Sequence, residues 1–171
     1  MALRHRIKLF EACVSPCVLY SCCTWTMTAD RERLLTSARR RMIRWIVRVP
    51  RRHDEEWVDY IVRATRRSEH LAEEHGSVSW VLTQRERKWI AAGRAACSTD
   101  SRWTKRLLTW KPWFRCYPFR TVGRPTKRWS DDLCLFAGGS WPDEALCTSL
   151  WRLSAQGYVD VNGDCWRGRS L

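Results

Sequence analysis

One stretch, from Thr28 to Pro50, constrains the fold of this chain more than any other. It reads "TADRERLLTSARRRMIRWIVRVP". Thr28 and Asp30 are candidate N-caps, and Pro50 cannot continue a helix because it has no backbone N–H. At about 100° per residue, the apolar side chains of this stretch share one arc of the helix surface. They predict a core-facing stripe of Leu34, Leu35, Ala38, Met42, Trp45, Ile46 and Val49.

Arginines of the same stretch occupy an adjoining arc. They are Arg33, Arg40, Arg41, Arg44 and Arg48. Like charges on neighbouring turns repel each other, so a bound anion would reduce the electrostatic repulsion among these arginines. The pattern therefore predicts one helix that packs with one face and offers guanidinium groups on another.

The remaining sequence also reads as helical. Residues 3–22 predict a helix that is broken or kinked near Pro16. A second long helix is expected from Asp54 to Gly76, and a third from Ser77 or Ser79 to about residue 97. Their expected core residues are Trp57, Val58, Ile61, Thr65 and Leu71, then Val81, Leu82, Trp89, Ala92 and Ala96.

Shorter helices are expected at 103–110, at 130–137 and after Ser140, and almost no segment alternates as a strand would. The fold class is therefore all-α, an irregular helical bundle with a basic, aromatic, proline-containing loop and no substantial sheet. We divide the chain into a basic helical segment at 1–52 and a helical bundle at 53–110. The loop follows at 111–128, and short helices with a tail make up 129–171.

The charge is concentrated in two blocks. Residues 1–52 carry 12 basic and 3 acidic side chains, and residues 101–130 carry 9 basic and no acidic ones. Two such blocks indicate a polyanion-binding surface, although a merely solvated basic face is the alternative.

The cysteines and the N-terminus bear on the compartment. Nine cysteines is an odd number with spacings unsuited to a disulfide scaffold, so we expect them to be reduced. The basic-then-apolar start is typical of a signal peptide, but Glu11 and Pro16 interrupt its apolar run. We therefore expect a nuclear or cytoplasmic protein, not a secreted one, with no membrane partner.

The segment "GRPTKRWSDDL" contains an aromatic-x-Asp-Asp sequence like that of polymerase active sites. In polymerases such a pair lies at a hairpin tip and binds two metal ions with a further carboxylate. Here the preceding residues are too basic for a buried strand, and Ser130 is a good N-cap. Asp131 and Asp132 are therefore interpreted as the first turn of a helix, where the helix dipole favours them.

Other catalytic or metal-binding patterns are weak. The four histidines lie in polar surroundings, and Cys13-x-x-x-Cys17 lacks the partners of a zinc finger. We predict no catalytic residue, no metal ligand and no cofactor.

Basic residues interleaved with aromatics remain, and they suit RNA or DNA. In the loop, Trp113 and Phe114 can equally be anchors or stacking platforms. Besides the five arginines named above, the predicted nucleic-acid-binding residues are Lys111, Trp113, Arg115, Arg120, Arg124, Lys127 and Arg128.

Three segments in order, "RIKLFEACVSPCVLYSCCTWTMT", "RLLTSARRRMIRWIVRVPRR" and "GRPTKRWSDDL", resemble the region after the palm in LINE-type, non-LTR retrotransposon reverse transcriptases. The resemblance covers residues 6–135. It departs from the family at Ser21, where the family usually has glycine after "LY", and at Cys23.

The resemblance implies that residues 6–50 correspond to the helical thumb, which packs on the template–primer duplex, and that the last motif belongs to the linker beyond it. It also implies a non-enzymatic chain, because the palm with its catalytic carboxylates and the fingers are expected upstream. Those missing domains are then expected partners. The alternatives are a stand-alone helical interaction protein, a translated relic without selected activity, or a secreted cysteine-rich protein.

Overall fold

A computed structural model describes residues 1–99, 103–109 and 127–164 of this chain. These residues form helices and connecting turns without a strand, which confirms the all-α fold class. Two compact units are present. The first consists of Met1–Ser21 and Thr28–Gln84, and the second of Cys22–Met27 with the described residues from Arg85 onward.

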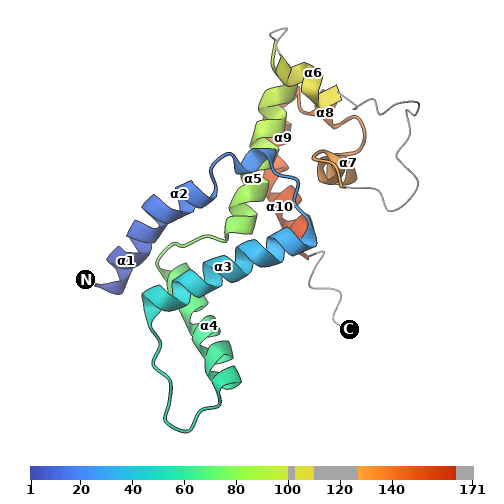
Figure 1. Ribbon diagram of the computed structural model, residues 1–171. Helices are drawn as coiled ribbons and strands as arrows, with labels where there is room; N and C mark the ends of the chain where they lie inside the picture. The colour runs from blue at the N-terminus through green and yellow to red at the C-terminus, as the bar shows by residue number, and fades with distance from the viewer. Residues whose placement is uncertain (100–102, 110–126, 165–171) are drawn as a thin grey trace. The chain divides into compact units, whose positions relative to one another are not determined.

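The N-terminal helix is interrupted near Pro16, as predicted. Helix α1 (Leu3–Leu9) passes through a π-helical turn (Phe10–Val14) into the short helix α2 (Ser15–Val18) (Figure 1). Because Pro16 has no N–H to donate, the regular hydrogen-bond ladder cannot run through it. The segment ends at Ser21, whose φ of 52° lies in the left-handed region.

Helix α3 (Ala29–Val47) begins where its sequence predicted. The Thr28 hydroxyl accepts a hydrogen bond from the backbone N–H of Arg31 at 3.4 Å, which is the geometry of an N-cap. The helix ends at Arg48, which adopts a left-handed φ of 56°. It therefore stops before Pro50.

Helix α4 (Trp57–Glu74) starts three residues later than the expected Asp54. The Glu56 carboxylate, not Asp54, accepts the N–H of Trp57 at 3.0 Å. At the other end Gly76 has a φ of 81°, a conformation that glycine adopts without steric cost. The predicted C-terminal stop is thus confirmed.

The buried side of α3 agrees with the predicted one only in part: of the predicted stripe, Leu35, Met42, Ile46 and Val49 are half-buried. Arg39 and Ile43 are buried, whereas Leu34 is 71% and Trp45 66% exposed. Helix α4 packs against α3, and its Glu69 and Thr65 side chains accept hydrogen bonds from Arg40 and Arg44. Leu34, Ala38 and Trp45 lie on the far side of that contact and are not core residues.

Helix α4 shows a similar difference. It buries the small residues Ala64, Ser68 and Ala72, and it leaves Trp57 58% exposed. Val58 is exposed as well. Trp57 is the first residue of the helix, and its ring centre lies 5.5 Å from that of Tyr60 and 5.9 Å from the Arg51 guanidinium. These small residues allow α3 and α4 to pack close together, so the contact between the two helices does not involve Trp57 or Val58.

Helix α5 (Trp80–Ala96) contributes its first turn to the first unit. The Trp80 ring stacks on Phe10 with centroids 5.7 Å apart. Its indole N–H donates to the Ser15 hydroxyl at 2.8 Å, so this buried polar group is satisfied. Arg39 is also buried here, and it donates to the Ser77 hydroxyl at 2.7 Å, which in turn donates to Glu11.

In its described residues the second unit combines the rest of α5 with a short 3-10 helix (Cys22–Thr24) and five further helices. These are α6 (Trp103–Thr109), α7 (Asp131–Ala137), α8 (Trp141–Glu144), α9 (Thr148–Leu153) and α10 (Ala155–Asp164). In this unit Trp89, Ala92 and Ala96 are buried as predicted. No described helix is both long and apolar enough to cross a membrane.

Two tryptophans form the centre of that unit's core. The rings of Trp89 and Trp151 stack 3.7 Å apart and 5° from parallel. Each indole N–H donates to the other residue's backbone carbonyl, at 2.7 and 3.0 Å. Gly93 lies one turn after Trp89, and a Cβ there would come within 2.6 Å of the Trp151 ring. Glycine is therefore required for this approach.

A buried polar cluster lies beside the tryptophans. The Lys88 ammonium is 2.7 and 2.8 Å from the two carboxylate oxygens of Asp132, and the Tyr158 hydroxyl donates to the same carboxylate at 3.0 Å. Lys88 is 1% and Asp132 8% exposed. Burial lowers the pKa of Lys88, and the nearby Asp132 opposes that shift.

Candidate nucleic-acid interface

The five arginines predicted on α3 do not share one role. Arg33 lies 3.5 Å from Asp30 on the exposed surface. Arg40 donates to the Glu69 carboxylate at 2.8 Å, and Arg44 donates to the Thr65 hydroxyl at 2.9 Å. Two of the five guanidinium groups therefore connect α3 to α4.

Arg41 and Arg48 are exposed, and their guanidinium groups make no hydrogen bond or ion pair within the described part of the chain. The Arg41 guanidinium lies 5.1 Å from the centre of the Trp45 ring, in a cation–π contact. Because no described residue accepts their guanidinium N–H groups, these groups are available to an external hydrogen-bond acceptor.

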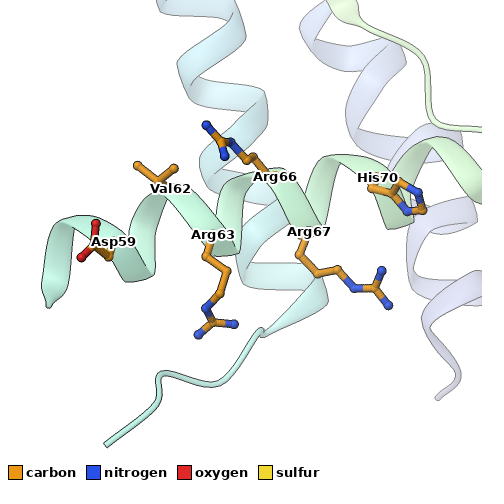
Figure 2. Close-up of a pocket in the computed structure, with 6 residues that line it drawn as sticks. All are labelled: Asp59, Val62, Arg63, Arg66, Arg67 and His70. Carbon is orange, nitrogen blue, oxygen red and sulfur yellow. The ribbon is translucent and has the colours of Figure 1, made fainter. Parts of the chain in front are cut away.

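Helix α4 adds basic residues that were not predicted. Arg63, Arg66, Arg67 and His70, with Asp59 and Val62, line an open depression on its exposed side (Figure 2). In this view the Arg63 and Arg67 side chains extend to one side of the helix and Arg66 extends to the other. Arg66 and Arg67 form no hydrogen bond or ion pair to any residue that the structure describes.

A signal for these residues was present in the sequence. Positions 63, 66, 67 and 70 are three and four residues apart, so they share one helical face. Residues 53–100 carry 7 basic and 9 acidic side chains. Their net charge is therefore slightly negative and does not indicate the local cluster of basic residues. Glu69 illustrates the point, since it pairs with Arg40 and does not neutralise Arg66 or Arg67.

Arg63 differs from its neighbours because it is fully engaged. Its guanidinium donates to both oxygens of Glu55, each at 2.6 Å, and to the carbonyl of Pro50 at 2.9 Å. These contacts attach the loop between α3 and α4 to helix α4. Hydrogen bonds from Arg63 lower the pKa of Glu55 to about 2 from the usual 4.5.

This shift predicts a pH dependence of folding. Between pH 4.5 and about 2 the unfolded Glu55 binds a proton that the folded one does not, so stability falls as the pH falls. The stabilisation is fully present above pH 4.5. In urea unfolding of the full chain followed across this range, Glu55→Gln should weaken the acid dependence.

Glu73→Gln is the matched control, because Glu73 is exposed on α4 and forms no ion pair among the described residues. It should retain the acid dependence of the original chain. Equal acid dependence in both variants would contradict the role assigned to Glu55.

Five predicted binding residues, Lys111, Trp113, Arg115, Arg120 and Arg124, lie outside the described residues. Lys127 and Arg128 are described and exposed. They precede α7, which begins at Asp131 as predicted. The Asp131 carboxylate accepts the backbone N–H of Arg128 at 2.8 Å, and Asp132 is held by Lys88.

The two aspartates therefore have structural partners, and the buried role of Asp132 was not predicted. Ser130 precedes α7, but its hydroxyl makes no capping hydrogen bond. Across the described ranges, no three His, Cys, Asp or Glu side chains gather in a way that could hold a metal ion.

Comparison with known proteins adds no relative: no family model, curated protein or solved structure matches this chain.

Proposed function

We propose that this chain binds RNA or DNA through the sugar–phosphate backbone and catalyses no reaction itself. The observation that carries the proposal is a set of exposed arginines whose guanidinium groups make no hydrogen bond or ion pair to any described residue: Arg41 on α3, with Arg66 and Arg67 on α4. The same unit uses Arg39, Arg40, Arg44 and Arg63 for its own contacts.

This division of the arginines is the physical argument. A guanidinium that bridges two helices contributes to folding, whereas one that faces water beside like charges gains nothing from folding. Phosphates supply the missing counter-charge, and binding them releases the counterions condensed on the nucleic acid. Arg66 and Arg67 extend to different sides of α4, so together they present positive charge over a wider part of its exposed surface.

We further propose that the chain derives from the thumb and post-palm linker of a LINE-type reverse transcriptase, with the palm and fingers of that polymerase as partners. One structural detail supports this origin. Ser21, which stands where the family usually has glycine, adopts the left-handed φ of 52°. Glycine takes that conformation most readily.

The binding proposal predicts a strong salt dependence. For the full chain and a template–primer duplex, the logarithm of the association constant should fall linearly with the logarithm of salt concentration. Replacing Arg41, Arg66 and Arg67 together by glutamine should lower the slope by about 2 to 3 units, since each lost phosphate contact removes about 0.9. Fluorescence anisotropy over a salt series measures both slopes.

Arg152→Gln serves as the control, because Arg152 is exposed on α9 in the second unit. It removes one positive charge while leaving the sequence of α3 and α4 intact, and it should leave the slope nearly unchanged. A flat salt dependence of the original chain would overturn the binding proposal.

The proposed origin is tested separately, by reading the full-length transcript from its true 5′ end. A frame that continues upstream into an aromatic-x-Asp-Asp box between apolar strands supports a polymerase parent. A transcript without such a region argues against that parent and leaves the binding proposal to the salt series.

A further inference from the structure

An exposed apolar stripe runs along α3. Leu34 and Ala38 are four residues apart, and Ala38 and Trp45 are seven residues, or about two turns, apart, so all three share one side of the helix. Leu34 is 71% and Trp45 66% exposed, and Ala38 is exposed too. Tryptophan is among the largest apolar side chains. Because Trp45 is exposed to water, the fold does not gain the hydrophobic stabilisation that burying this ring would provide.

The surroundings of Trp45 are cationic. Arg41 lies one turn before it, with its guanidinium 5.1 Å from the ring centre. The Arg41 guanidinium has no hydrogen-bond or ion-pair partner in the described ranges, and Arg48 follows at the end of the same helix. An exposed aromatic ring with adjacent unpaired guanidinium groups combines a stacking surface with phosphate donors.

A second exposed tryptophan shows that this arrangement is not general. Trp57 also has an arginine nearby, with Arg51 5.9 Å from its ring centre. However, the guanidinium of Arg51 donates twice to the Glu55 carbonyl, at 2.9 and 2.6 Å, and the Tyr60 ring lies 5.5 Å from Trp57. The Arg51 donors and the Trp57 ring thus both have further partners, whereas among the described residues the Arg41 guanidinium forms no hydrogen bond and no second aromatic ring contacts Trp45.

We propose that Trp45, with Arg41, is a stacking site for an unpaired base of a single-stranded nucleic acid. The proposal rests on the proposed function and specifies its ligand: a strand whose base faces are free. A duplex buries its base faces by pairing and stacking, so it can supply phosphates to Arg41 but no ring to Trp45. An uncharged apolar partner would cover the stripe but leave the arginines without an anion.

The test compares two oligonucleotides with the full chain. One is a fluorescent homopyrimidine single strand of about 12 nucleotides, within the site sizes common for such proteins, and the other is a duplex of the same length. Trp45→Leu keeps the apolar bulk but removes the aromatic face. It should weaken single-strand binding about 5- to 100-fold and leave duplex binding nearly unchanged.

Two further variants make the comparison specific. Trp45→Phe keeps a π-face and should retain most of the single-strand affinity. Trp57→Leu is the matched control for an exposed tryptophan beside an arginine, and it should bind both oligonucleotides like the original chain. Urea unfolding of each variant confirms that it is folded.

The outcomes separate this inference from the function on which it rests. If Trp45→Leu binds the single strand as well as the original chain does, while salt-dependent binding persists, the stacking site is wrong and the proposed function stands. If the original chain binds neither oligonucleotide, both fail. If Trp45→Leu instead abolishes self-association seen by sedimentation and leaves oligonucleotide binding unchanged, the stripe contacts a second copy, and the inference is overturned.

Discussion

Trp89→Ala should destabilise the second unit by about 3 to 5 kcal/mol, the range for removing a large buried aromatic side chain. Trp89 is 1% exposed and stacks on both Trp151 and Tyr158, with ring centres 3.7 and 4.6 Å apart. The change also removes one of the two side-chain donors to the Trp151 carbonyl, the other being the Ser154 hydroxyl at 3.2 Å. Chemical denaturation of the full chain, followed by far-UV circular dichroism, measures the loss.

Trp45→Ala is the matched control, since it removes the same side chain from the exposed side of α3. It should cost only about 0.5 kcal/mol, as expected for a surface substitution. The sequence pattern assigned Trp45 to the core, and that interpretation predicts a cost similar to that of Trp89→Ala. Equal costs would therefore contradict the burial described for these two residues.

Asp132→Ala is expected to destabilise the chain by about 3 to 5 kcal/mol, because it leaves the Lys88 ammonium buried without an anion. Tyr158 would lose its hydrogen-bond acceptor at the same time. The Trp129 ring, whose centre is 5.0 Å from the Lys88 nitrogen, is too weak a partner to replace a carboxylate. The free energy of unfolding, measured in urea at neutral pH, reports this effect.

The neighbouring residue provides the control. Asp131→Ala removes a carboxylate from the same helical turn, one that accepts the exposed backbone N–H of Arg128; the loss of this hydrogen bond should cost about 1 kcal/mol, as a lost cap does. The double replacement Lys88→Met with Asp132→Leu removes both buried charges and should recover most of the stability. A double variant as unstable as Asp132→Ala would show that the ion pair itself, not the unpaired charge, dominates.

The positions of the helices were largely predictable, because their ends depend on nearby residues. Thr28 caps α3, Gly76 follows α4 in a left-handed conformation, and Pro16 interrupts the first helix. Each of these is a local effect of one residue on its own backbone or the next turn. The start of α4 was missed by three residues, since Glu56 and not Asp54 caps it.

The candidate interface was predictable only in part. The sequence indicated that α3 has an arginine face, but not that Arg40 and Arg44 would contact Glu69 and Thr65 of α4. It also did not indicate that Arg66 and Arg67 would remain exposed and form no hydrogen bond or ion pair with the residues that the structure describes. Which arginines remain available depends on acceptors that lie 21 or 29 residues away in the chain.

By itself the sequence determined that the chain is helical, where its main helices begin and end, and that its N-terminal part is strongly basic. Only the tertiary structure decided which residues of α3 and α4 are buried. Arg39 enters the core because Ser77, 38 residues away, accepts its hydrogen bond, and Lys88 does so because Asp132, 44 residues away, pairs with it. Helical periodicity places residues on a common face, but whether that face is covered depends on partners that the chain brings together only when it folds.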